Sequence, residues 1–281
     1  MSLLLAVDVG NTNIVLGIFD LAAGDAGPIL HSWRLATSRE RTVDEYGLSS
    51  LALLKHAGID AAAIRHVVIS SVVPPLHPVL DAWLRVYFKA EPLWIEPGIK
   101  TGLKVLLDNP AELGADRIVN AVAGLEAYGA PLIAVDFGTA TTFDVVNDKR
   151  EYLGGIICPG LKISAEALFQ RASRLPRVEI AEPERLVGRS TIQAMQSGLF
   201  YGYVGQVDGI LERLLAEFPG SRVVATGGLA KVIAPASRFT VSWGGHMYED
   251  AWQIRGYEEF LMDMLQRPEW CEYILDRLMA N

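Results

Sequence analysis

Short apolar runs of strand length open the chain and recur near its middle. Residues 3–7 and 14–19 flank one polar turn, and residues 132–135 and 143–146 flank a second. An apolar run, a tight turn of small residues and another apolar run predict a β-hairpin. We therefore expect one hairpin in each half of the chain. Further strands are expected to begin near residues 29, 66, 93, 152 and 222, and paired glycines are expected to break the strand that begins at 152.

Between these strands the apolar residues recur with helical spacing. The spacing predicts helices over the following ranges: 42–56, 78–88, 112–129, 163–172 and 192–218. Residues 98–110 are expected to form a loop. Beyond residue 240 the spacing predicts two more helices, which Pro268 separates. The alternation of strands and helices is typical of an α/β protein.

The turn of the first hairpin carries groups suited to binding phosphate and a metal ion. Gly10 permits close approach of a ligand to the backbone, and successive N–H groups there form an anion-binding nest. Asp8, at the end of the strand, is suited to holding Mg²⁺ through its waters. An ordinary hairpin turn has the same composition, so this turn alone leaves both interpretations open.

The second turn repeats the pattern. Asp136-Phe-Gly-Thr-Ala-Thr-Thr142 follows an apolar run, as Asp8 does, 128 residues later (136 minus 8). Two phosphate-binding hairpins, one in each half of the chain, describe the actin-like fold of sugar kinases, Hsp70 and actin, in which ATP lies between two related domains. We expect domains over residues 1–117 and 118–239, followed by an atypical helical tail over 240–281.

Two further pairs of residues have both a structural and a functional interpretation. Asp116 lies near a predicted helix start, where a carboxylate stabilises the helix by about 0.3–1 kcal/mol. Arg117 alone is typical of a solvated charge on the surface. Together they also provide a base beside an anion-binding group. Ser70 and Ser71 either line a nucleotide cleft or form a turn.

Composition restricts the partners. The formal net charge is −8, from 33 acidic and 25 basic residues, which argues against nucleic acid as the main partner. The apolar runs are shorter than the roughly 20 residues that a membrane helix needs, so we expect no membrane association. The two cysteines, Cys158 and Cys271, are too few for a disulfide framework and favour a cytoplasmic location.

An ordered set of motifs covers residues 3 to 239. They are Asp8-Val-Gly-Asn-Thr-Asn13, Ser70-Ser-Val-Val-Pro74, Gly114-Ala-Asp-Arg117, Asp136-Phe-Gly-Thr-Ala-Thr-Thr142, Gly154-Gly155 with Pro159-Gly160, Gly188-Arg-Ser-Thr191 and Thr226-Gly-Gly228. In this order and spacing the set resembles the type III pantothenate kinase family. The resemblance implies a homodimer that phosphorylates pantothenate with ATP, Mg²⁺ and a monovalent cation (K⁺ or NH₄⁺), the first step of coenzyme A biosynthesis.

The resemblance also implies a role for individual residues. Asp116 is expected to be the general base and Asp136 the ligand of the monovalent cation. The expected pantothenate contacts are Leu107, Gly114, Ala115, Asp116, Arg117 and Thr191, the last from the partner subunit. The expected ATP contacts are Asp8, Val9, Gly10, Asn11, Thr12, Asn13, Ile14, Val15 and Thr139. At its ordinary pKa of about 3.9, Asp116 would be ionised at pH 7.

The chain departs from the family pattern in two places. Leu107 stands where the family usually has a tyrosine that contacts pantothenate, and residues 240–281 do not match the family. Residues 255–262 weakly resemble a helix of uroporphyrinogen decarboxylase-like proteins. Two alternatives therefore remain: a non-catalytic actin-like nucleotide-binding regulator, and a kinase for a different small alcohol.

Overall fold

The computed structural model describes residues 3–20, 29–99 and 101–239. These residues form two compact units, one of residues 3–103 and 108–126 and the other of residues 104–107 and 127–239. The predicted domain boundary at 117/118 stays a prediction. The helices predicted beyond residue 240, and the resemblance of residues 255–262, lie outside the described residues.

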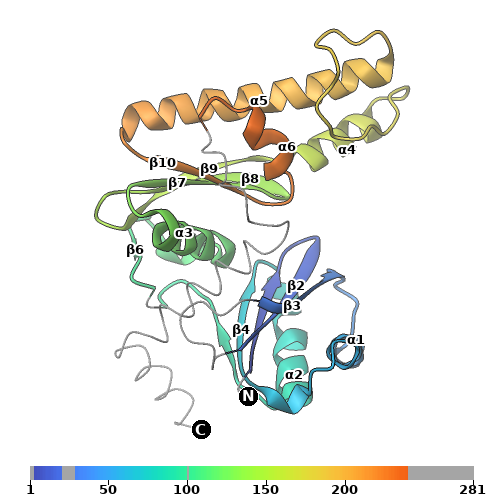
Figure 1. Cartoon of the computed structure of the whole chain (residues 1–281), viewed down its shortest axis with the longest axis vertical. Helices are drawn as coiled ribbons and strands as arrows, with labels where there is room; N and C mark the ends of the chain where they lie inside the picture. Colours follow the sequence, from blue (N-terminus) through green and yellow to red (C-terminus); the bar gives the residue numbers. More distant parts are fainter. Residues whose placement is uncertain (1–2, 21–28, 100, 240–281) are drawn as a thin grey trace. The chain divides into compact units, whose positions relative to one another are not determined.

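The first unit contains a five-stranded mixed sheet in the order β3-β2-β1-β4-β5 (Figure 1). Its strands are β1 (Leu3–Val9), β2 (Asn13–Asp20), β3 (Ile29–Ala36), β4 (Ile64–Ser71) and β5 (Pro92–Trp94). Strands β1, β2 and β3 pair antiparallel, whereas β4 pairs with β1 and β5 with β4 in parallel. The helices of this unit include α1 (Val43–His56) and α2 (His77–Phe88), and α3 (Ala115–Tyr128) begins in it.

The second unit contains another five-stranded mixed sheet, in the order β10-β7-β8-β9-β6. Its strands are β6 (Lys104–Val105), β7 (Leu132–Phe137), β8 (Ala140–Val146), β9 (Glu151–Pro159) and β10 (Arg222–Thr226). Its helices are α4 (Leu161–Arg171), α5 (Thr191–Glu217) and α6 (Ala230–Ile233). Strands β7, β8 and β9 pair antiparallel, and β10 pairs in parallel with β7. The pairing of β9-β8-β7-β10 therefore repeats that of β3-β2-β1-β4.

Helix α1 shows how the sequence sets the ends of an element. The Thr42 side chain accepts a hydrogen bond from the Glu45 N–H at 3.3 Å, and the Glu45 carboxylate accepts one from the Thr42 N–H at 2.7 Å. This reciprocal capping box satisfies two N–H groups that a helix start leaves unpaired. At the other end Gly58 has a positive φ of 72°, a conformation that glycine adopts without steric cost.

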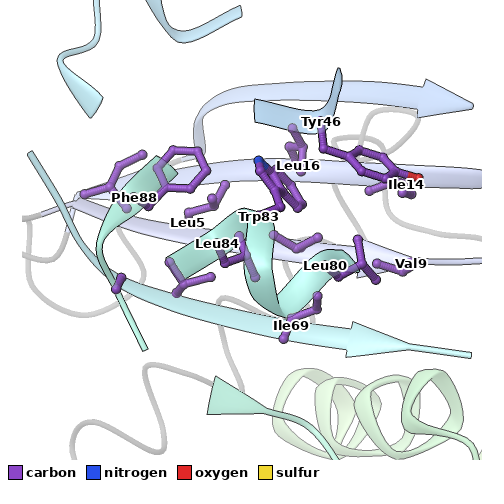
Figure 2. Packing of buried hydrophobic residues seen from close by; sticks show 14 of the residues in the cluster. Leu5, Val9, Ile14, Leu16, Tyr46, Ile69, Leu80, Trp83, Leu84 and Phe88 are labelled. Atoms are coloured by element: carbon purple, nitrogen blue, oxygen red, sulfur yellow. The ribbon is translucent and has the colours of Figure 1, made fainter. Parts of the chain in front are cut away.

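The core of the first unit lies between its sheet and helices α1 and α2 (Figure 2). Trp83 and Tyr46 are fully buried there, and the centroids of their rings lie 5.4 Å apart. The Trp83 indole N–H donates to the Ser50 hydroxyl at 3.1 Å, so the buried polar atom of the indole is satisfied. The core of the second unit joins β7, β8 and β10 to α5 and α6.

Two predictions about strands need correction. The predicted loop over 98–110 contains the short strand β6, because Lys104 and Val105 pair with Glu151 and Tyr152 of β9. The predicted break of the strand at Gly154-Gly155 is a shift in register instead. Gly154 has φ 132°, and β9 continues to Pro159. Both features depend on the partner strand, which the local sequence does not reveal. The other helices and strands predicted within the described residues are confirmed, with ends that differ by a few residues.

None of the helices in residues 3–20, 29–99 and 101–239 is both long and apolar enough to cross a membrane.

Candidate active site

The first hairpin turn connects β1 to β2 and is stabilised by its own backbone. The Gly10 N–H donates to the Asn13 carbonyl at 2.9 Å, while Asn11 and Thr12 are exposed at the tip. A Cβ on Gly10 would lie 3.2 Å from the Asn13 carbonyl oxygen, so a side chain there would crowd the turn. The turn thus presents exposed backbone of the kind that binds anions.

Asp8 lies at the base of this turn. It is half-buried and pairs in register with Ser70 of the parallel strand β4. The Ser70 hydroxyl donates to the Asp8 carboxylate at 3.5 Å, the long limit for a hydrogen bond. Ser70 thus contacts the aspartate of the predicted nucleotide hairpin, and its place in a nucleotide cleft stays a prediction.

Asp116 lies in the first turn of α3, next to the same strands. The Arg117 N–H donates to the Asp116 carboxylate at 2.8 Å, and the Gly114 carbonyl accepts from the N–H groups of Arg117 and Ile118. A Cβ on Gly114 would lie 2.6 Å from Asp116 Oδ1 and 3.8 Å from a Val72 methyl group. Val72 in turn donates its N–H to the Val9 carbonyl at 3.0 Å. The structure therefore brings Asp116 close to the strand that carries the first turn.

The surroundings of Asp116 change its acidity. Burial raises the pKa of the Asp116 carboxyl above its ordinary value, although the hydrogen bond from the Arg117 N–H and the Arg117 charge act in the opposite direction. The sequence-based expectation of an ordinary pKa is therefore wrong. A raised pKa makes a carboxylate a stronger base.

The second hairpin turn is enclosed by other segments of its own unit. Asp136 is 9% exposed at the end of β7, and it pairs in register with Thr226 of the parallel strand β10. A Cβ on Gly227, whose φ is 89°, would lie 2.3 Å from Asp136 Oδ1. Gly227 is thus both a strand-to-helix turn residue and a close neighbour of the candidate cation ligand.

Thr139 is exposed at the tip of this second turn. Its carbonyl accepts from the Gly160 N–H at 3.0 Å, and a Cβ on Gly160 would lie 2.2 Å from the Thr139 carbonyl oxygen. Only a glycine fits at residue 160 without displacing the turn. The backbone of Thr139 is therefore held in place by the segment that begins α4.

Leu107 and Thr191 both lie in the second unit. Leu107 is half-buried, and one of its methyl groups lies 3.5 Å from the position of a Cβ on Gly154. Thr191 is exposed at the start of α5, directly after the helix cap Ser190. Among the residues that contact the turns, sequence reasoning assigned no individual role to Thr37 or Gly160. It left Gly227 open between a strand-to-helix turn and a position near the adenosine, which the glycine pair has in actin-like kinases. For the glycines the motif Pro159-Gly160 and the pair Gly227-Gly228 were the available signals; for Thr37 there was none.

Metal-binding groups are sparse in the described part of the chain, where no cluster of three or more His, Cys, Asp or Glu side chains is placed to hold an ion. The single carboxylates Asp8 and Asp136 fit ions that take most of their ligands from phosphate, water or backbone oxygen. Mg²⁺ in nucleotide sites is bound in this way.

Comparison with known proteins identifies the family. A model of the type III pantothenate kinase family matches residues 4–213. The chain belongs to the type III pantothenate kinase family. A type III pantothenate kinase from Myxococcus xanthus is 56% identical over 238 residues, which are 84% of this chain and 91% of the relative. Its counterpart from Halalkalibacterium halodurans is 53% identical over 236 residues, with the same shares covered.

Solved structures with low sequence identity show that this type III pantothenate kinase family member has the actin-like fold of sugar kinases. A protein from Sinorhizobium meliloti assigned as a 2-dehydro-3-deoxygalactonokinase aligns with a TM-score of 0.53 at 15% identity, covering 95% of this chain and 97% of that one. The activator of the 2-hydroxyisocaproyl-CoA dehydratase from Clostridium difficile aligns with a TM-score of 0.52 at 12% identity, covering 98% and 97%. The predicted fold class is confirmed.

Proposed function

We propose that the protein transfers the γ-phosphoryl group of ATP to the primary hydroxyl of pantothenate, the first step of coenzyme A biosynthesis. The observation that carries this proposal is the identity of 53–56% with relatives named type III pantothenate kinase, over 84% of the chain. The motifs that carry the sequence resemblance all lie in the part that aligns or shortly after it.

In this proposal Asp116 is the general base. Phosphoryl transfer requires mainly correct positioning and stabilisation of charge, and the base takes the proton of the attacking hydroxyl. The raised pKa of Asp116 supports the role, because a base works best when its pKa approaches the working pH. Gly114, Ala115, Arg117, Leu107 and Thr191 are assigned to pantothenate.

The ATP phosphates are assigned to the turn from Asp8 to Val15 and to Thr139 of the second turn. The backbone N–H groups of such turns bind phosphate oxygens without any side-chain charge. We assign Mg²⁺ to the side of Asp8 and the monovalent cation, K⁺ or NH₄⁺, to Asp136. Both ions would balance the negative charge of the phosphates and of the transition state.

A homodimer is the proposed assembly, and α5 is the surface that supports it. Gly198, Gly202 and Gly205 are exposed on this helix, and a Cβ on any of them would meet nothing within 4 Å in its own chain. Glycines in such a row permit another helix to approach closely. Large exposed apolar side chains lie in the same unit at Ile157, Leu186, Val187 and Ile192.

The dimer is tested by sedimentation of two variants. Gly202→Leu should shift the protein toward monomer, because the new side chain would fill the open row. Ala216→Leu, at an exposed position near the end of the same helix, should leave the dimer intact. If both variants and the wild type sedimented as dimers, this surface would be excluded as the dimer interface.

The activity is tested by incubating the purified chain with ATP, Mg²⁺, K⁺ and pantothenate, and by assaying 4′-phosphopantothenate directly. Product formation is the expected result. Leu107 places an apolar side chain beside Gly154, so the assay should also compare pantothenate with a more apolar alcohol. A more apolar alcohol phosphorylated faster than pantothenate would replace pantothenate in the proposal, and nucleotide binding without turnover of any alcohol would favour a regulator. A cytoplasmic location stays a prediction.

A further inference from the structure

Thr37 contacts the first hairpin turn in two places. It directly follows β3, and its hydroxyl donates to the Gly10 carbonyl at 2.7 Å. Its backbone N–H donates to the Thr12 carbonyl at 3.0 Å. One residue just beyond the neighbouring strand β3 therefore binds the carbonyl groups on both sides of Asn11.

These two hydrogen bonds determine the direction of two N–H groups. In a planar trans peptide the C=O and N–H bonds point in opposite directions. Because the Gly10 carbonyl points toward Thr37, the N–H of Asn11 points away from it, and the Thr12 carbonyl orients the N–H of Asn13 in the same way. The N–H of Gly10 is already bound to the Asn13 carbonyl. Thr37 thus orients two N–H donors on the side of the turn away from itself.

Of the two hydrogen bonds from Thr37, only the one from the hydroxyl depends on the side chain. Glycine has the widest range of backbone conformations, so the peptide that joins Gly10 to Asn11 is the part of the turn most free to rotate. The backbone bond from Thr37 to Thr12 continues the pairing of β2 with β3 and survives a change of side chain. The hydroxyl contact at 2.7 Å depends on the side chain itself.

We propose that Thr37 is a positioning residue for phosphate binding, which orients the N–H donors of the turn toward the ATP phosphates. The inference rests on the proposed function only in assigning ATP phosphates to this turn. Thr37 does not take part in the chemistry. Its effect is on nucleotides that carry phosphates, and not on pantothenate or on the adenosine moiety.

The experiment compares three variants by calorimetric titration with MgATP and, separately, with adenosine. Thr37→Val keeps the shape and the backbone bond but loses the hydroxyl, and it should bind MgATP about fivefold more weakly, as expected for one lost hydrogen bond. Thr37→Ser restores the hydroxyl and should bind MgATP like the wild type. The affinity for adenosine should be the same in all of them.

Thr42→Val is the matched control. Thr42 lies five residues further along and caps α1 through its hydroxyl. Thr42→Val also loses the hydrogen bonding of a side-chain hydroxyl, but this hydroxyl lies outside the turn. The affinity for MgATP should therefore stay at the wild-type value. Backbone hydrogen exchange gives a second readout: the Gly10 amide, which is bonded to the Asn13 carbonyl within the turn, should exchange faster in Thr37→Val and at the wild-type rate in Thr42→Val.

The outcomes separate this inference from the proposed function. Binding is measured without pantothenate, so a wild type that binds MgATP but does not phosphorylate pantothenate overturns the proposed function alone. Equal MgATP affinity of Thr37→Val and the wild type overturns the role of Thr37. Equal weakening of MgATP and adenosine binding overturns it as well, because the effect would then not be specific for phosphates.

Discussion

The two hairpins have the same sequence pattern and the same pairing but different surroundings. Asp8 pairs with Ser70 across a parallel strand pair, and Asp136 pairs with Thr226 in the corresponding way. The first turn is exposed at its tip and held by Thr37. The second is also exposed at its tip, at Thr139, but Gly160 and Gly227 lie against its backbone and its buried aspartate.

In the proposed function the two aspartates of this motif serve different purposes. An exposed turn with oriented N–H groups is suited to binding and releasing a nucleotide. A buried carboxylate surrounded by backbone is suited to holding an ion in a fixed place, because its position does not vary. The candidate base Asp116 lies close to the strand of the first turn. The following predictions test this division.

The largest effect is expected from Asp116→Asn. Loss of a general base lowers kcat by about 10²–10⁴-fold. Burial disfavours the charged form of Asp116 in the folded state, so the neutral variant should be at least as stable as the wild type at pH 7. Steady-state kinetics and urea unfolding measure the two effects.

The pH dependence of the free energy of unfolding gives a control for Asp116→Asn. With a raised folded-state pKa, Asp116 binds its proton more tightly in the folded protein. Its contribution to stability is therefore greatest in acid and declines as the pH rises through the folded pKa. The variant's advantage should disappear in acid. Normal turnover by this variant would refute the assignment of the base.

Gly160→Ala and Gly10→Ala compare the second turn with the first. The new Cβ would lie 2.2 Å from a backbone oxygen at residue 160 but 3.2 Å from one at residue 10. We expect Gly160→Ala to lower the free energy of unfolding by about 1–3 kcal/mol, the usual cost of overpacking, and Gly10→Ala to lower it less. Urea denaturation measures both, and equal losses would contradict the comparison.

The pH dependence of the rate tests Asp116 without a substitution. Its pKa is raised by burial, so protonation should begin above the pH at which an ordinary aspartate titrates. Below its pKa the rate should fall about tenfold per pH unit, since one proton inactivates the base. Circular dichroism at each pH shows whether the fold persists. A rate that stays constant down to the ordinary aspartate pKa would contradict the burial effect.

The smallest effect is expected from the monovalent cation. If Asp136 holds K⁺ or NH₄⁺ in the second turn, as the family resemblance implies, replacing K⁺ by Na⁺ should lower kcat. Asp136→Asn should remove this difference between the two cations. Initial rates in matched chloride salts measure it. If the wild type were indifferent to the cation, Asp136 would have only a structural role.

The local sequence determined the elements and most of the candidate residues. Thr42 with Glu45 specifies the start of α1, and Gly58 follows its end, because capping requires only neighbouring residues. The apolar runs on either side of Asp8 and Asp136 were sufficient to predict both hairpins, because a hairpin also forms between neighbouring segments of the sequence. The ordered motifs were sufficient to predict the family, which the comparison confirmed.

Tertiary structure alone decided how these residues are held. The strand β6 exists because Lys104 and Val105 meet β9, and the pKa of Asp116 is raised because the folded chain buries it. Thr37 reaches Gly10 across 27 positions of sequence, and Gly160 and Gly227 reach the second turn from different segments. Such contacts depend on which strands become neighbours. Sequence periodicity describes the face of one element, and it contains no information about the partner that this face meets.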